Sequence, residues 1–342
     1  MKRPSIARKT MALAATLTLT LGVAGCGKGA STDAEGGQSY QWDFTITTGQ
    51  TSTWYEGAER FAEILDEKSD GRMKVNIFTN EQLSGGDPAA GVEQLMNGDK
   101  AFSYNSTIIY AGLDPKFGAI NAPFLYSDID QAEAAIDAGA ADAYEELSSS
   151  AGVKMLGFGE SGFRQLTNNV RAVDDPEDLN GVKMRIPGIG LFTDAYNLLG
   201  ADPTTMDFAE VFTALQQGTI DGQENPIDII YTSGLDEVQD YLTIWNYVYD
   251  PLILGMNEDL FDSLSEEDQQ IVLDAAAEAN ELQITNNRER EADELDELRD
   301  SMEVTELTPE QQQAFAETMQ PLYDQYQSIW GADLAKAVQP RS

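Results

Sequence analysis

The stretch NGVKMRIPGIGLFTDAYNLLGADPTTMDFAEVFTALQQGTIDGQENP, residues 180–226, decides the fold. Its first apolar residues alternate with Lys183 and Arg185, a period that predicts a strand with one buried face. A Pro-Gly pair ends this strand. The apolar positions that follow recur at helical spacing and predict a helix closed by Gly200.

A second helix and two further strands complete the stretch. Residues 201–206 predict a short strand, and Asp207 with Glu210 has the form of a capping box that opens a helix. Gly218 closes that helix, and residues 220–223 predict a third strand. Strand, helix, strand, helix and strand in so short a stretch imply a parallel sheet with right-handed crossovers.

Two polar residues at the ends of these strands form a candidate site. Ligands of such sheets bind at the carboxyl ends of the strands. Arg185 is one residue from the end of the first predicted strand, and Asn225 lies just past the end of the third. A fixed cation beside a fixed amide suits a carboxylate ligand. A structural ion pair is the alternative for Arg185, because the chain has 59 acidic residues, and these features alone leave both open.

The composition excludes several classes of function. The chain has 342 residues, a formal net charge of −38, no histidine and one cysteine, Cys26. A chain this acidic lacks the basic surface that displaces counterions from nucleic acid, so we expect no nucleic-acid partner. Without histidine there is no Ser-His-Asp triad, no Cys-His dyad and no imidazole-bound metal. Carboxylate, lysine and tyrosine chemistry remains open, but the prediction assigns no catalytic residue, metal ligand or cofactor.

The N-terminal residues predict export and anchoring. A basic start precedes an apolar segment that is short for a membrane span and typical of a signal peptide. Val-Ala-Gly-Cys then ends at Cys26 and resembles the lipobox of bacterial lipoproteins, with an ordinary cleavage site as the alternative. We expect a lipoprotein signal peptide over 1–26 and a flexible tether over 27–39. The mature protein would then be extracytoplasmic and lipid-anchored to the cell membrane at Cys26.

The rest of the chain predicts two α/β lobes, because a set of strand-helix units lies near each end of 40–249. Residues 154–158 and 163–167 are expected to form two strands joined through glycines. Residues 241–249 are expected as a strand or linker, and a separate strand is expected from residue 250.

A long helical pattern follows these strands. Ser265 caps it, and it continues to about residue 301, which at 1.5 Å per residue gives ~50 Å. Such a helix could tie two domains together. Its later part is nearly all charged, and pairs such as Arg290 and Glu294 are interpreted there as a solvated helix face.

The glycines at 157, 159 and 162 match the spacing of the dinucleotide-binding fingerprint. That fingerprint needs a helix directly after it, because the pyrophosphate binds at the helix N-terminus. Residues 163–169 predict a strand and a turn instead. Tight strand connections are therefore the preferred interpretation, and a secreted NAD-dependent oxidoreductase is the alternative function of another class.

Several ordered pieces of the chain carry a resemblance to one family. They are LNGVKMRIP (179–187), LGADP (199–203), FAEVFTAL (208–215), DGQENP (221–226), WYEGA (54–58) and RQLTN (164–168). Taken together, they make the chain similar to the DctP family, the extracytoplasmic solute-binding proteins of TRAP transporters. The resemblance runs from about Thr45 to the last predicted helix.

The resemblance implies a two-lobed, periplasmic-binding-protein-like α/β fold with a long bridging helix. It places lobe I at 40–161 plus 250–289 and lobe II at 162–249 plus 290–338. It implies that the lobes close around one small organic acid and deliver it, unchanged, to TRAP permease subunits in the membrane. An ATP-driven (ABC-type) solute-binding protein of the same general architecture is the alternative within this class.

The resemblance also implies roles for single residues. Arg185 matches the arginine that holds the ligand carboxylate, Arg164 matches a second, assisting arginine, and Asn225 matches the asparagine of the Glu-Asn-Pro element. The other expected ligand contacts are Phe208, Ser106, Trp54 and Thr48.

Overall fold

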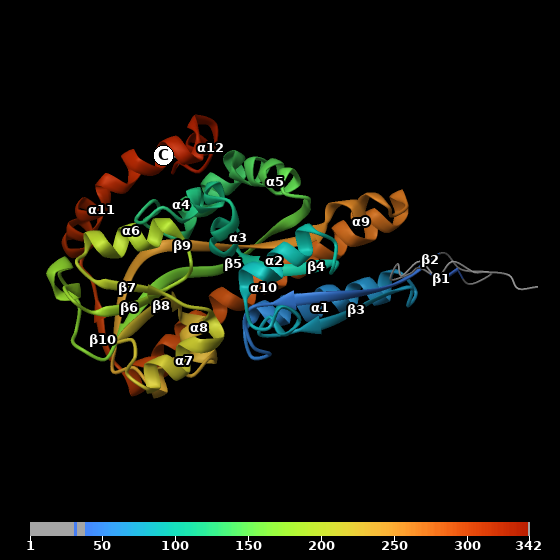
Figure 1. The fold of residues 1–342 in the computed structure, drawn as a ribbon. Helices are drawn as coiled ribbons and strands as arrows, with labels where there is room; N and C mark the ends of the chain where they lie inside the picture. The colour runs from blue at the N-terminus through green and yellow to red at the C-terminus, as the bar shows by residue number, and fades with distance from the viewer. Residues whose placement is uncertain (1–30, 33–37, 341–342) are drawn as a thin grey trace, which may run out of the picture.

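One mixed sheet runs through the whole molecule (Figure 1). The computed structural model describes residues 31–32 and 38–340. The expected signal peptide, Cys26 and most of the expected tether lie outside the described residues. Ser31–Thr32 pairs antiparallel with Gln38 and Ser39, so the last two residues of the expected tether already belong to a strand.

Strands and helices alternate along most of the chain. The strands are β1 (Ser31–Thr32), β2 (Gln38–Ile46), β3 (Met73–Phe78), β4 (Phe102–Ser106), β5 (Val153–Asn168), β6 (Lys183–Ile186), β7 (Asp202–Thr205), β8 (Gly222–Pro226), β9 (Tyr241–Asn257) and β10 (Glu303–Glu306). The α-helices are α1 (Thr53–Lys68), α2 (Pro88–Met96), α3 (Thr107–Leu113), α4 (Ile129–Ala135), α5 (Ala141–Ser150), α6 (Gly190–Leu198), α7 (Phe208–Gln216), α8 (Ile227–Thr232), α9 (Glu258–Asp262), α10 (Glu266–Ser301), α11 (Pro309–Trp330) and α12 (Ala332–Ala337). A π-helical turn (Ile136–Ala140) joins α4 to α5, and short 3-10 helices lie at Gln82–Ser84, Pro115–Asn121, Pro176–Leu179 and Leu235–Glu237.

The sheet contains two parallel blocks joined by antiparallel strands. β2 pairs in parallel with β3 and β4, and β6 pairs in parallel with β7 and β8. Between the two blocks lie β9 and β5, which pair antiparallel with each other and with the neighbouring block. The parallel sheet expected from residues 180–226 is confirmed. β8 extends further than expected, to Pro226, so Asn225 lies within this strand rather than past its end.

β5 and β9 are each one continuous strand, so the prediction of two separate elements in each region was wrong. The β5–β9 register shifts at three places, between Met155 and Phe158, Glu160 and Gly162, and Arg164 and Leu166. Gly157 and Gly162 have φ values of 127° and 92°, which other residues rarely adopt. These glycines bend the strand without ending it, as in β-bulges. Both strands therefore run between the two parallel blocks, where β9 pairs with β4 of one block and β5 pairs with β8 of the other.

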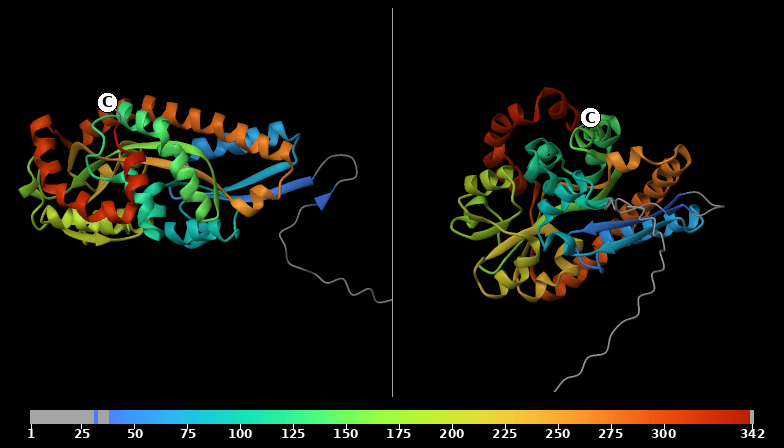
Figure 2. Two further views of the ribbon diagram at one scale, coloured as in Figure 1. Left: turned by 90° about the horizontal axis from the view of Figure 1, so that it is seen from above. Right: turned by 45° about the vertical axis from the view of Figure 1, so that its right-hand side comes forward.

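The long helix is confirmed. α10 has 36 residues, and its N-cap residue Ser265 accepts a hydrogen bond from the backbone amide of Asp268 at 3.1 Å. Figure 2 shows α10 extending along most of the length of the molecule. Its first half packs in a core with α1 and β2, and its end packs in a core with α7 and α8. No helix in the described part of the chain is both long and apolar enough to span a bilayer.

The later part of α10 is not a solvated face throughout. Arg290 pairs with Glu294 at 2.8 Å, as its spacing predicted, but the Glu294 side chain is only 6% exposed. Arg290 also contacts Glu56 of α1 at 2.8 Å and Asp228 of α8 at 3.5 Å. The interpretation as a solvated pair was wrong, because α1 and α8 cover this side of the helix.

Candidate functional site

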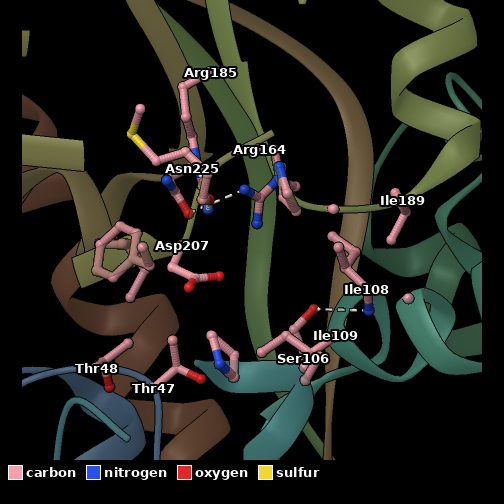
Figure 3. Close-up of a pocket in the computed structure, with 18 of the residues that line it drawn as sticks. Thr47, Thr48, Ser106, Ile108, Ile109, Arg164, Arg185, Ile189, Asp207 and Asn225 are labelled. Atoms are coloured by element: carbon pink, nitrogen blue, oxygen red, sulfur yellow. Dashed lines mark hydrogen bonds between the residues drawn. The ribbon is translucent and has the colours of Figure 1, made fainter. Parts of the chain in front are cut away.

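The seven predicted ligand-binding residues line one pocket between the two parallel blocks (Figure 3). It lies at the carboxyl ends of β2, β4, β6, β7 and β8, where sheets of this kind place their ligands. The lining residues are Thr47, Thr48, Trp54, Pro88, Ala89, Ser106, Ile108, Ile109, Gly112, Arg164, Arg185, Pro187, Gly188, Ile189, Met206, Asp207, Phe208, Asn225 and Ile229.

Arg185 is a buried cation without a carboxylate partner among the described residues. Its residue surface is 4% exposed, and its Nε and Nη2 both donate to the backbone carbonyl of Met206, at 2.9 and 2.7 Å. The Phe208 ring lies 5.9 Å from its guanidinium carbon. Burial lowers the pKa of Arg185 to about 10, an effect that Glu224 opposes and Arg164 reinforces. The structural ion pair considered for Arg185 is therefore not formed.

Arg164, unlike Arg185, pairs with buried carboxylates. Its Nε and Nη2 donate to the Glu224 carboxylate at 2.5 and 2.8 Å, and its Nη1 donates to Asp250 at 2.6 Å. Burial on its own would lower the pKa of Arg164, but Glu224 and Asp250 outweigh it and raise the pKa. Two buried carboxylates thus compensate this one cation, and most of its donors are occupied.

Asn225 sits beside both arginines. Its side-chain oxygen accepts from Arg164 Nη2 at 3.0 Å, and its Nδ2 donates to Gln223 at 2.5 Å. Asn225 is 5% exposed, and it reaches the pocket from the end of β8. This arrangement fixes the amide next to the free donors of Arg185 (Figure 3).

The three predicted residues on the other side of the pocket have partners of their own. Ser106 is the N-cap of α3, accepts from the backbone amide of Ile108 at 3.0 Å, and donates to Asp250. Trp54 donates its indole N–H to Ser161 at 3.1 Å. The Thr48 and Ser52 hydroxyls are 2.6 Å apart. These residues form the wall of the pocket, and their contact with a ligand stays a prediction.

Asp207 departs from its expected role. The helix α7 begins after it, but the Asp207 side chain makes no capping hydrogen bond, so the predicted capping box does not form. Figure 3 shows the carboxylate turned into the pocket instead. Although Asp207 is exposed, the partial loss of water around its carboxylate, with the like charges of Asp87 and Glu210, raises its pKa, and Arg185 opposes this effect.

Sequence reasoning missed the buried acids behind the pocket. Glu224 and Asp250 are fully buried at Arg164, and Tyr247 donates its hydroxyl to Glu224 at 2.5 Å. Burial raises the pKa of Asp250, and Arg164 opposes this. A signal existed for Glu224, which precedes Asn225 in the Glu-Asn-Pro element. Nothing near Asp250 in the sequence links it to Arg164, because the two lie 86 residues apart.

Two other chemistries lack support in the described residues. The sequence predicted a strand and not a helix after Gly162, and β5 indeed continues past this residue to Asn168, so the dinucleotide-binding geometry is not formed. In the part of the chain that the structure describes, no group of three or more carboxylates, histidines or cysteines is arranged to hold a metal ion.

The fold is an α/β architecture with a pocket between two parallel blocks. A buried arginine without a carboxylate partner among the described residues lines this pocket, and together these features are those of a solute-binding protein. The sequence model of bacterial extracellular solute-binding protein family 7, DctP, matches residues 44–329. The chain belongs to this family, whose members include the TRAP solute-binding proteins.

Similar proteins cover nearly the whole described chain. The 2,3-diketo-L-gulonate-binding periplasmic protein of Escherichia coli is 31% identical over 304 residues, covering 86% of this chain and 90% of that protein. A TRAP periplasmic solute-binding protein of Ralstonia eutropha, solved with (S)-2-acetolactate, is 30% identical. Its TM-score is 0.85, and the match covers 87% of this chain and 97% of that protein. Another, from Sulfurospirillum deleyianum and solved with succinate, is 28% identical. Its TM-score is 0.82, and the match covers 88% of this chain and 98% of that protein.

Proposed function

We propose that the protein captures one small organic acid between its two lobes and holds the acid's carboxylate with Arg185. Arg185 itself is the observation that carries this proposal. A buried guanidinium without a carboxylate partner is costly, and an anionic ligand relieves that cost through a bidentate contact. The diketogulonate, acetolactate and succinate bound by similar proteins all carry a carboxylate.

The size of the pocket supports a small ligand. Its cavity is about 130 Å³. A cavity needs only about 10–15 Å³ to hold one water, so this cavity has room for a ligand several times larger than water. Small organic acids are ligands of this kind.

The proposed route continues at the membrane. The protein would be anchored through an acylated Cys26 and would release the acid, chemically unchanged, to the permease subunits of an ion-gradient-driven TRAP transporter. The lobe boundaries at 40–161 plus 250–289 and 162–249 plus 290–338 fit this proposal, because each lobe then supplies one wall of the pocket. Family membership supports the delivery to a permease, and the lipobox-like sequence that ends at Cys26 supports the anchor.

The experiment is a thermal-shift screen of organic acids followed by calorimetry on the best ligand. We expect Arg185→Ala to weaken binding more than 100-fold, because truncating one partner of a buried charge pair costs about 3 kcal/mol or more. The matched control is Arg171→Ala, which removes an exposed arginine from the same lobe. Unchanged affinity in Arg185→Ala, with the fold intact by circular dichroism, would count against the proposal.

A further inference from the structure

The balance of charge in the pocket bears on which acids it accepts. Among the described residues that line it, the only cations are Arg164 and Arg185. Glu224 and Asp250 already pair with Arg164. Arg185 therefore retains the most free donors for a ligand anion, whereas most of the Arg164 donors are occupied, and this is enough for one carboxylate.

A second carboxylate would find no comparable partner. Much of the remaining wall is apolar, formed by Pro88, Ala89, Ile108, Ile109, Ile189 and Met206. Burying a charged group against such a wall without hydrogen bonds is strongly unfavourable. The fold does not decide this point, because similar proteins were solved both with a monocarboxylate and with succinate.

Asp207 adds a negative charge to the same space. It is exposed, it lines the pocket from the start of α7, and its carboxylate forms no hydrogen bond or ion pair with the described residues. The position is that of a helix cap, yet the side chain is turned away from the helix and toward the ligand space (Figure 3). A carboxylate placed in this way repels a ligand anion and accepts hydrogen bonds from a ligand hydroxyl.

We propose that Asp207 is a specificity-determining residue, which excludes acids with a second carboxylate and favours hydroxylated monocarboxylates. This inference rests on the proposed function, since it assumes that Arg185 holds the first carboxylate. The ligand would lie with its carboxylate at Arg185 and a hydroxyl group at Asp207.

The test uses acids matched in length that differ by one carboxylate. The pairs are butanoate and succinate, erythronate and tartrate, and gluconate and glucarate, each titrated by calorimetry. The proteins are the wild type, Asp207→Asn and the matched control Glu210→Gln. Glu210 is an exposed carboxylate in the first turn of the same helix and does not line the pocket. Thermal unfolding of each variant checks that it folds.

We expect the wild type to bind the monocarboxylate of a pair at least about tenfold more tightly than the dicarboxylate, and erythronate or gluconate more tightly than butanoate. Asp207→Asn should reduce the mono-to-dicarboxylate ratio by about tenfold, because the amide is neutral. Glu210→Gln should leave the ratio as in the wild type.

Two results would overturn the inference while leaving the proposed function standing. One is that the wild type binds dicarboxylates as tightly as their monocarboxylate partners or more tightly, with Arg185→Ala still abolishing binding. The other is that Asp207→Asn leaves the ratio unchanged. If no acid of either kind binds to the wild type, the proposed function fails and the inference fails with it.

Discussion

The two arginines that line the pocket differ in whether the fold supplies them with buried carboxylate partners. Arg164 is held by Glu224 and Asp250, whereas Arg185 has only the carbonyl of Met206 and the face of Phe208. Removing Arg164 leaves two buried carboxylates uncompensated. Removing Arg185 leaves no buried charge behind. The same substitution should therefore affect stability at one position and binding at the other.

We predict that Arg164→Met lowers the free energy of unfolding by about 3–5 kcal/mol, the usual cost of removing one partner of a buried ion pair. Arg185→Met should stay within about 1 kcal/mol of the wild type or be more stable, because it removes an unpaired buried charge. Urea denaturation of the ligand-free proteins measures both. Equal losses in the two variants would show that the buried acids do not depend on Arg164.

This difference between the two arginines could not be predicted from the sequence. Both arginines match family positions, and both lie in predicted strands, Arg164 in 163–167 and Arg185 near the end of the strand that starts the 180–226 stretch. What separates them is the position of Asp250, which comes from β9, and of Glu224, which comes from β8. These partners are brought together by the sheet, so no local pattern records which arginine they compensate.

At the scale of elements, α8 is linked to α1 and α10 by a buried carboxylate. Asp228 of α8 accepts from the backbone amide and the hydroxyl of Thr53 at the start of α1, both at 3.3 Å. Its other carboxylate oxygen lies 3.5 Å from Arg290 of α10. Burial, followed by the charge of Glu294, raises the pKa of Asp228 to about 7, while Arg290 and Thr53 oppose the shift.

This pKa gives stability a pH dependence of known sign. An unfolded Asp has a pKa of about 3.9. The folded protein therefore holds a proton that the unfolded chain releases between about pH 4 and pH 7. The contribution of Asp228 to stability is fully present below about pH 4 and is lost as pH rises through 7.

Asp228→Asn should remove this dependence, because the amide does not titrate. The free energy of unfolding of the wild type minus that of the variant should fall as pH rises from 4 to 8, by at most about 4 kcal/mol. Urea denaturation at several pH values measures it, with Asp240→Asn, at an exposed carboxylate, as control. A difference that is constant with pH would contradict the prediction.

The sequence predicted elements well where the hydrophobic periodicity was clear and capping or turn residues marked the ends of the element. β6, α6, β7 and α7 and the capped start of α10 all begin within about two residues of their expected positions. The prediction from sequence failed where the same sequence pattern is compatible with two different structures. Glycines in β5 bend a strand but also resemble breaks, and an Asp before a helix can cap it or, as with Asp207, point elsewhere.

The pair Arg290 and Glu294 failed for another reason. The spacing of an exposed ion pair is the same as that of a buried one. Only the packing of α1 and α8 over α10 distinguishes them, and the contact with α1 joins residues 234 positions apart in the sequence. Burial of charged helix positions is therefore decided by tertiary contacts.

At the scale of the whole molecule, the proposed anchor can be tested independently of the ligand. Cys26 lies outside the described residues, so its role is a prediction from the lipobox alone. We expect the wild type, expressed in a bacterium, to sediment with membranes and to be released by detergent. Cys26→Ser should appear in the soluble fraction, because the serine lacks the thiol to which the lipid would be attached.

The control is a variant with an unrelated substitution in the same segment, Ser31→Ala, which keeps the cysteine. Metabolic labelling with a fatty acid should mark this variant and the wild type but not Cys26→Ser. Membrane association of Cys26→Ser at the wild-type level would rule out the anchor and leave the binding function unaffected.

The passage of β5, β9 and α10 through both halves has a practical consequence. Because both halves of the molecule contain parts of these three segments, neither half is expected to fold alone. Splitting the chain near its middle would leave each fragment with unpaired strands. An engineered split reporter or a permuted biosensor built on this scaffold would therefore need its new ends in a surface turn such as Gly85-Gly86. There the break would spare every shared segment, and an optical readout could follow occupancy of the cleft.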